Sequence, residues 1–88
     1  MSPKLHFEQY GNRATNSGVS RYAIAPDAIH VQFHGGRIYV YSNGMPGPEH
    51  VERMKRLARQ GFGLSTYISQ QVQHHYERWY SEQPDPSS

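Results

Sequence analysis

The side chains best suited to chemistry in this chain lie between Arg21 and Tyr41, where arginine, histidine and tyrosine alternate with apolar residues. Arginine neutralises phosphate groups, and tyrosine rings stack on nucleic-acid bases. Both residue types are also enriched at protein interfaces. An ordinary solvated sheet surface is the third interpretation of the same pattern. The residues that we expect to form this surface are Arg21, His30, Gln32, His34, Arg37, Tyr39 and Tyr41.

No catalytic or metal-binding pattern accompanies this surface. On one strand, His30 and His34 would lie roughly 13 Å apart, which is too far to share an ion. His74 and His75 are adjacent in the sequence and would point roughly 100° apart on a helix. No serine stands in a G-x-S-x-G turn, and Gly61-Phe62-Gly63 is a weak match to a dinucleotide-binding loop. We therefore expect no catalytic residue, no metal and no cofactor.

The stretch from Ile29 to Tyr41 must position most of the expected surface. Its apolar and polar residues alternate on both sides of Gly35-Gly36, which predicts a β-hairpin with a two-residue turn. In that register Val31 faces Val40, and the polar residues share one face. The opposite, apolar face consists of Ile29, Val31, Phe33, Ile38 and Val40. A slip of one residue would scramble both faces.

A second turn extends the hairpin to a three-stranded meander. Residues 19–25 have the composition of a strand, and Pro26-Asp27 favours a type I turn because proline presets φ. Antiparallel pairing then places Ile24 opposite Ile29 on the apolar face. Two independent turns thus predict the same two faces.

Two helices are expected to cover the apolar face. Residues 48–60 begin with a proline suited to a first helical turn and end before Gly61, a natural stop. Residues 64–80 show a second apolar stripe at helical spacing. The sequence therefore predicts an α+β domain over residues 18–80, in which both helices pack on one face of a three-stranded antiparallel meander. We expect a flexible arm over residues 1–17 and a disordered tail over residues 81–88.

The first predicted helix also carries a basic face. Arg53 and Arg56 have glutamates four residues earlier, so we expect them to form ion pairs along the helix. Lys55 and Arg59 have no such partner and are candidates to contact phosphate. A solvated helix face is the alternative to a phosphate-binding one.

Length and composition limit the class of protein. Eighty-eight residues are enough for one domain, and so small a core makes a homodimer a reasonable expectation. The lack of cysteine excludes disulfides and cysteine-ligated zinc. A formal net charge of +2 permits nucleic-acid binding without arguing strongly for it. No apolar run has the length of a signal peptide or a membrane span, so we expect a cytoplasmic protein without membrane contact.

Short motifs through the chain resemble those of a known family. A strand ending in F-x-x-G-x-x-Y-x-Y precedes a proline-bearing loop, a helix ending in L-A-x-x-G, the segment G-L-S-x-Y-I and a later tyrosine. The residues are Phe33, Gly36, Tyr39, Tyr41, Pro46, Leu57, Ala58, Gly61, Gly63, Leu64, Ser65, Tyr67, Ile68 and Tyr76. They resemble the KTSC family, small domains named for the C-terminus of a lysyl-tRNA synthetase. The resemblance implies a compact α+β module without an established reaction, and it hints at nucleic-acid association.

From the sequence we expect a small non-catalytic binding module of KTSC type. Its first expected partner is another protein or its own copy, bound through the polar sheet face. The alternative is RNA or single-stranded nucleic acid bound through the same residues. An enzyme of unrecognised type is the third hypothesis.

Overall fold

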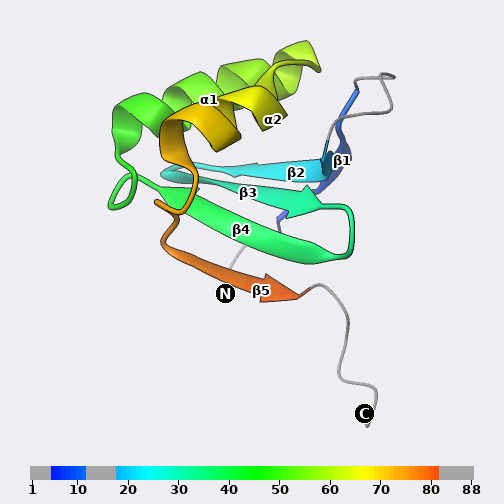
Figure 1. The fold of residues 1–88 in the computed structure, drawn as a ribbon, viewed down its shortest axis with the longest axis horizontal. Coiled ribbons are helices and arrows are strands. Elements are labelled where there is room, and N and C mark those ends of the chain that lie inside the picture. The colour runs from blue at the N-terminus through cyan, green and yellow to red at the C-terminus, as the bar shows by residue number, and fades with distance from the viewer. Residues whose placement is uncertain (1–4, 12–17, 82–88) are drawn as a thin grey trace, which may run out of the picture.

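A five-stranded antiparallel sheet forms the centre of the fold, and its strands follow one another in chain order. The structure is a computed structural model that describes residues 5–11 and 18–81. Helical segments cover one face of the sheet (Figure 1). The strands are β1 Glu8–Gln9, β2 Val19–Ala25, β3 Ala28–Phe33, β4 Arg37–Ser42 and β5 Arg78–Ser81; the helical segments are α1 Pro48–Gln60, α2 Leu64–Tyr67 and the π-helical turn η1 Ile68–Val72, which continues α2. The α+β class is confirmed, but within the described residues the sheet has five strands rather than the predicted three.

The hairpin of β2 and β3 has the predicted register. Ala25 pairs with Ala28 across the Pro26-Asp27 turn, and Ile24 lies opposite Ile29. Ile29 is fully buried and Ile24 packs against the same core, so both side chains lie on the helix-covered face. A turn whose proline restricts φ leaves little freedom in how the two strands align.

The hairpin of β3 and β4 closes through a longer loop than predicted. β3 ends at Phe33 and β4 begins at Arg37, so the loop contains His34, Gly35 and Gly36. The Gly36 N–H donates to the Phe33 carbonyl at 3.0 Å. Both glycines have positive φ, 105° and 95°, which glycine adopts without the steric cost that a Cβ imposes. Three-residue loops of this kind are a common alternative to the two-residue turn.

The extra loop residue moves β4 by one position relative to β3. Val31 pairs with Tyr39 and Ile29 pairs with Tyr41, whereas the prediction placed Val31 opposite Val40. Because side chains alternate between the faces of a sheet, this shift exchanges the faces of every β4 side chain. The predicted separation of an apolar face from a polar face is therefore wrong.

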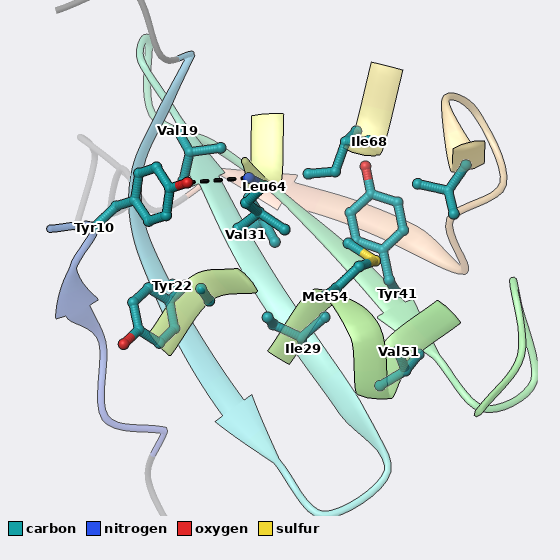
Figure 2. Close-up of a cluster of buried hydrophobic side chains, with 12 residues drawn as sticks. Tyr10, Val19, Tyr22, Ile29, Val31, Tyr41, Val51, Met54, Leu64 and Ile68 are labelled. Atoms are coloured by element: carbon teal, nitrogen blue, oxygen red, sulfur yellow. Dashed lines mark hydrogen bonds between the residues drawn. The ribbon is translucent and has the colours of Figure 1, made fainter. Parts of the chain in front are cut away.

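The β4 tyrosines consequently lie on the helix-covered face. Tyr41 is 1% exposed and belongs to the main core together with Ile29, Val31 and Met54 (Figure 2). The buried members of this core are Tyr10, Val19, Tyr22, Ile29, Val31, Tyr41, Val51, Met54, Ala58, Leu64, Ile68 and Val72. Large aromatic rings bury more apolar area than Ile38 and Val40, the β4 side chains that the predicted register placed there.

The other face of the sheet is buried as well, although none of the described helices covers it. Ile38 and Val40 are at most 3% exposed on this side. Rings from two neighbouring segments cover it, because Phe7 and Tyr80 both pack edge-on against the imidazole of His30. The sheet therefore has an apolar core on one face and a thinner, partly polar layer on the other.

Helix α1 has the predicted bounds. Pro48 occupies its first turn, and Gly61 ends it in the left-handed conformation with its N–H directed at the carbonyls of Leu57 and Ala58. The stripe that includes Val51 faces the core as expected. The first helix thus follows directly from its local end signals.

The predicted helix over residues 64–80 is wrong in its second half. The helical conformation ends at Val72, and Gln73 has a positive φ of 38°. The chain then reverses, and Arg78–Ser81 forms β5, which pairs with β4. Tryptophan and tyrosine at positions 79 and 80 suit a strand, and their pairing satisfies backbone groups along β4.

The predicted flexible arm is also wrong for residues 5–11. Glu8–Gln9 forms β1 and pairs with β2. Tyr10 is 5% exposed, and its hydroxyl accepts a hydrogen bond from the Leu64 N–H at 3.0 Å (Figure 2). The rest of the predicted arm and the predicted tail beyond Ser81 lie outside the described residues, while Ser81 itself belongs to β5.

Candidate functional site

The structure distributes the predicted binding surface over both faces of the sheet. The residues away from the helices are Arg21, His30 and Gln32; those on the helix side are Arg37, Tyr39 and Tyr41; and His34 lies in the β3–β4 loop. Arg21 Nε donates to Gln32 Oε1 at 2.8 Å, so these two side chains bind each other across the hairpin. The predicted single platform does not form.

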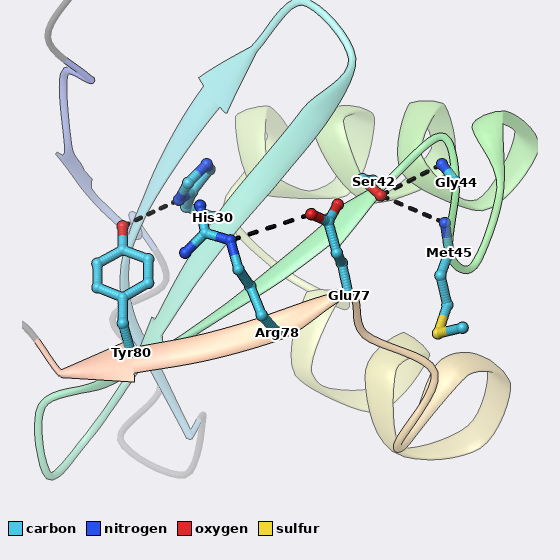
Figure 3. A network of polar contacts seen from close by, with 7 residues as sticks. All are labelled: His30, Ser42, Gly44, Met45, Glu77, Arg78 and Tyr80. Carbon is cyan, nitrogen blue, oxygen red and sulfur yellow. Dashed lines mark hydrogen bonds and ion pairs between the residues drawn. The ribbon is translucent and has the colours of Figure 1, made fainter.

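His30 belongs to a polar cluster that holds the last strand against the sheet. Its Nδ1 lies 2.9 Å from the Tyr80 hydroxyl (Figure 3). Burial lowers the pKa of His30, and the positive charge of Arg78 lowers it further, while Glu77 partly offsets both effects. A buried histidine that is hydrogen-bonded across strands has a structural role here.

A groove brings the other predicted residues together. It has a volume of about 660 Å³ and lies between the loop end of β3 and β4 and the turn η1. This volume is in the range of ligand-binding sites, which are concave and mainly apolar with a few polar groups. The groove is lined by Phe33, His34, Gly35, Arg37, Tyr39, Tyr41, Ile68, Ser69, Gln73, His74 and Tyr76. His34, Arg37, Tyr39 and Tyr41 thus meet at one site, although not on an open sheet.

Aromatic rings form a continuous wall of the groove. The ring of Tyr39 lies 5.4 Å from that of Phe33 and 4.6 Å from that of Tyr76, measured between centroids, and both contacts are edge-to-face. Tyr76 also contacts Tyr41, at 6.2 Å. Phe33, Tyr39 and Tyr76 remain partly exposed, so ring surface is accessible from the groove. Such a wall can hold a planar or apolar group.

Tyr41 forms the buried end of this wall. Burial raises the pKa of the Tyr41 phenol, and the neighbouring Tyr39 and Tyr76 raise it further. The phenol therefore stays neutral over the whole physiological range. A neutral, buried ring suits a packing role and does not supply a general base.

Arg37 provides the permanent positive charge of the groove. Its guanidinium lies 3.5 Å from the Tyr39 hydroxyl and 4.2 Å from the centre of the Trp79 ring. Among residues 5–11 and 18–81, no carboxylate pairs with Arg37, and none of the residues that line the groove is acidic. The site is therefore suited to a ligand that carries negative charge.

The helical side of the groove was not predicted. Ser69, Gln73, His74 and Tyr76 meet there because the chain leaves the helix after Val72. π-Helical turns occur often at functional sites because they displace the residues that follow. The strand-forming composition of residues 78–81 was the signal in the sequence that could have located this break.

The predicted phosphate contacts differ in their exposure. Lys55 is 4% exposed, and its Nζ donates to the Pro26 carbonyl at 3.2 Å and pairs with Glu52 at 3.3 Å. Lys55 therefore fastens α1 to the β2–β3 turn, and its charge is not presented at the surface. Arg59 is exposed near the end of α1, as is Arg56, whose expected partner Glu52 binds Lys55 instead.

The described residues offer little for other kinds of chemistry. Within residues 5–11 and 18–81, no group of three histidine or acidic side chains comes close enough to bind one metal ion. None of the helices in this part of the chain is long and apolar enough to cross a membrane.

Comparisons of the chain with protein-family models, with curated proteins and with solved structures gave no match.

Proposed function

We propose that this chain is a non-catalytic binding module that takes bases of single-stranded nucleic acid into the aromatic groove. The observation that carries the proposal is a groove that combines partly exposed rings, from Phe33, Tyr39 and Tyr76, with the guanidinium of Arg37 and is lined by no acidic residue. Within the described part of the chain, no carboxylate forms an ion pair with that guanidinium. Single-stranded nucleic acids present the matching chemistry, namely flat bases next to phosphates.

The expected contributions of base stacking and phosphate binding support a modest but measurable affinity for single strands. Stacking of one base on an aromatic side chain contributes about 1–3 kcal/mol, which corresponds to about 5- to 150-fold in affinity. The contribution of Arg37 to phosphate binding depends on salt, because counterions are released when a phosphate is neutralised. Binding at this site is therefore expected to tolerate many sequences and to weaken as salt is added.

A protein partner or a second copy of the chain is the competing proposal. Its expected surface was the polar sheet face, and the register of β4 divides that surface between two sides of the sheet. Phe62, at 60% exposure in the connector between α1 and α2, is an aromatic anchor of the kind that protein interfaces use. Nucleic acid is preferred because Arg37 and the rings meet in one concave site.

We also propose that the chain is a KTSC-like module. Residues that carry the resemblance converge on the groove, which supports a link between the shared motif and binding. Those residues are Phe33, Tyr39, Tyr41, Ile68 and Tyr76.

The test is a fluorescence-anisotropy titration of labelled single-stranded RNA and DNA octamers at low and high salt. Tyr39→Leu keeps apolar bulk but removes the stacking ring, so affinity should fall about 5- to 150-fold. Arg37→Gln should weaken binding and flatten its salt dependence. Arg53→Gln is the matched control, because it also removes an exposed positive charge, from α1 and away from the residues that line the groove.

Two results would count against the proposal. One is equal weakening by Arg37→Gln and Arg53→Gln, since that pattern indicates general charge attraction. The other is unchanged affinity in Tyr39→Leu. A sedimentation mass that grows with protein concentration, without binding of either octamer, would favour self-association instead.

A further inference from the structure

Trp79 stands beside the groove without lining it. β5 pairs with β4 so that Trp79 lies opposite Tyr39, and the two ring centroids are 6.5 Å apart. Trp79 is nevertheless 46% exposed, and it belongs to β5 at the edge of the sheet. The fold therefore places a large accessible aromatic surface next to the aromatic wall of the groove.

Arg37 connects this tryptophan with the groove. Its guanidinium stacks over the indole at 4.2 Å and also reaches the Tyr39 hydroxyl at 3.5 Å. A guanidinium carries five N–H donors, and stacking on a ring leaves its edges available for hydrogen bonds. The Arg37 guanidinium thus lies at the boundary between the groove and the indole, and it has further N–H donors that can bind a ligand.

Trp79 and Arg37 offer the same chemistry as the groove beside them, namely an aromatic ring next to a positive charge. A base can stack on the exposed indole or on the plane of the guanidinium, as bases do in proteins that bind single strands. In a single strand, successive bases are joined by a phosphate. Arg37 contacts both Tyr39 of the ring wall and the indole of Trp79, so a phosphate bound by its guanidinium would lie close to a base on either ring.

We propose that Trp79 and Arg37 form a second base-binding site, so that the chain binds two successive nucleotides and Arg37 holds the phosphate between them. This inference rests on the proposed function of the groove. It adds the length of the ligand that the site requires and assigns a binding role to Trp79. The ligand class is a single strand of at least two nucleotides, and a mononucleotide occupies only part of the site.

The test is a length series with an adenine mononucleotide, the dinucleotide and the tetranucleotide, measured by calorimetry. Wild-type protein should bind the dinucleotide about tenfold more tightly than the mononucleotide, because one more base stacks. Trp79→Leu should lose this gain, so that it binds the dinucleotide no more tightly than it binds the mononucleotide. Trp79→Phe keeps a stacking ring and should keep most of the gain, which separates stacking from a general effect on β5.

A second measurement uses the wild-type protein alone. Trp79 is the only tryptophan in the chain, so intrinsic tryptophan fluorescence reports on this site. The dinucleotide should change that fluorescence in proportion to binding. Dinucleotide binding without a fluorescence change, or an equal length gain in Trp79→Leu, would overturn the second site while leaving groove binding intact. Failure of all three ligands to bind wild-type protein would overturn the proposed function as well.

Discussion

The hydroxyl of Tyr10 connects the first strand with the second helical segment. It accepts the N–H of Leu64, a buried residue at the start of α2 where no helical partner exists for that donor. Tyr10→Phe removes the acceptor and leaves the donor unsatisfied. We expect the free energy of unfolding to fall by about 1–3 kcal/mol, measured by urea denaturation.

Tyr22→Phe is the matched control for this prediction. Tyr22 belongs to the same core. Its hydroxyl forms no hydrogen bond with a described residue, and it is not a buried polar group that lacks a partner. Its removal should change the stability by less than about 0.5 kcal/mol. Equal effects of Tyr10→Phe and Tyr22→Phe would contradict the role assigned to the Tyr10 hydrogen bond.

His30 should make stability depend on pH. Its pKa in the folded protein is lowered, first by burial and then by Arg78, below the ordinary value of 6.5. Between the two values the unfolded chain binds more protons than the folded one, so stability falls as the pH falls through that window and levels off below the folded pKa. His30→Gln should lose less stability than wild type between about pH 7.5 and about pH 5.

His34→Gln provides the comparison, because His34 is exposed in the β3–β4 loop. A change in the pH dependence of the urea midpoint in His30→Gln that is larger than in His34→Gln would assign the effect to the buried histidine. If His30→Gln instead behaved as wild type does, the stability change would have to come from other groups, and the buried His30 of Figure 3 would not be its source.

At the level of elements, the break after η1 depends on Gln73. The His75 N–H donates to the Val72 carbonyl at 2.6 Å, which closes a reverse turn with Gln73 at its first central position. Gln73 has φ 38° and ψ −103° there, a region that glycine occupies far more readily. Gln73→Gly should therefore raise the free energy of unfolding by about 1 kcal/mol.

Gln71→Gly tests whether this gain belongs to the turn. Gln71 is an exposed residue inside η1, where glycine costs about 0.5–1 kcal/mol of backbone entropy. The two urea midpoints should move in opposite directions. A loss of stability in both variants would contradict the strained turn.

The elements differ in how far their sequence determined them. Pro26-Asp27 and the pair Pro48 and Gly61 act through backbone restrictions, so the β2–β3 turn and α1 could be predicted from local residues. Two successive glycines restrict nothing, and the β3–β4 loop could close with two residues or three. The tyrosines of β4 do not decide between the two loop lengths, because a tyrosine packs in a core as well as at a surface.

The prediction of the second helix beyond Val72 was wrong for a related reason. Leu64, Ile68 and Val72 have helical spacing, and Tyr76 and Trp79 continue that spacing by coincidence. Their place is decided by the open edge of β4, which pairs with residues 78–81. Such a long-range contact is absent from any local window, so tertiary pairing overrides the local pattern.

For the whole molecule, the groove results from these two unpredicted features together. The shift of β4 brings Tyr39 and Arg37 to the helix side, and the break after Val72 opens the space beside them. The residue types of the site could therefore be predicted in part, with His34, Arg37, Tyr39 and Tyr41 among them. Their geometry could not, because it depends on a register that the sequence pattern satisfies in two ways.

The most direct test of nucleic-acid binding in the groove is a titration of isotope-labelled protein with a single-stranded RNA octamer, followed by NMR at two salt concentrations. If the groove binds nucleic acid, the largest shifts should occur at the amides of Phe33, Tyr39 and Tyr76, and they should be smaller at higher salt. Shifts centred on His30 and the face of the sheet away from the helices, or no shift at either salt concentration, would contradict it.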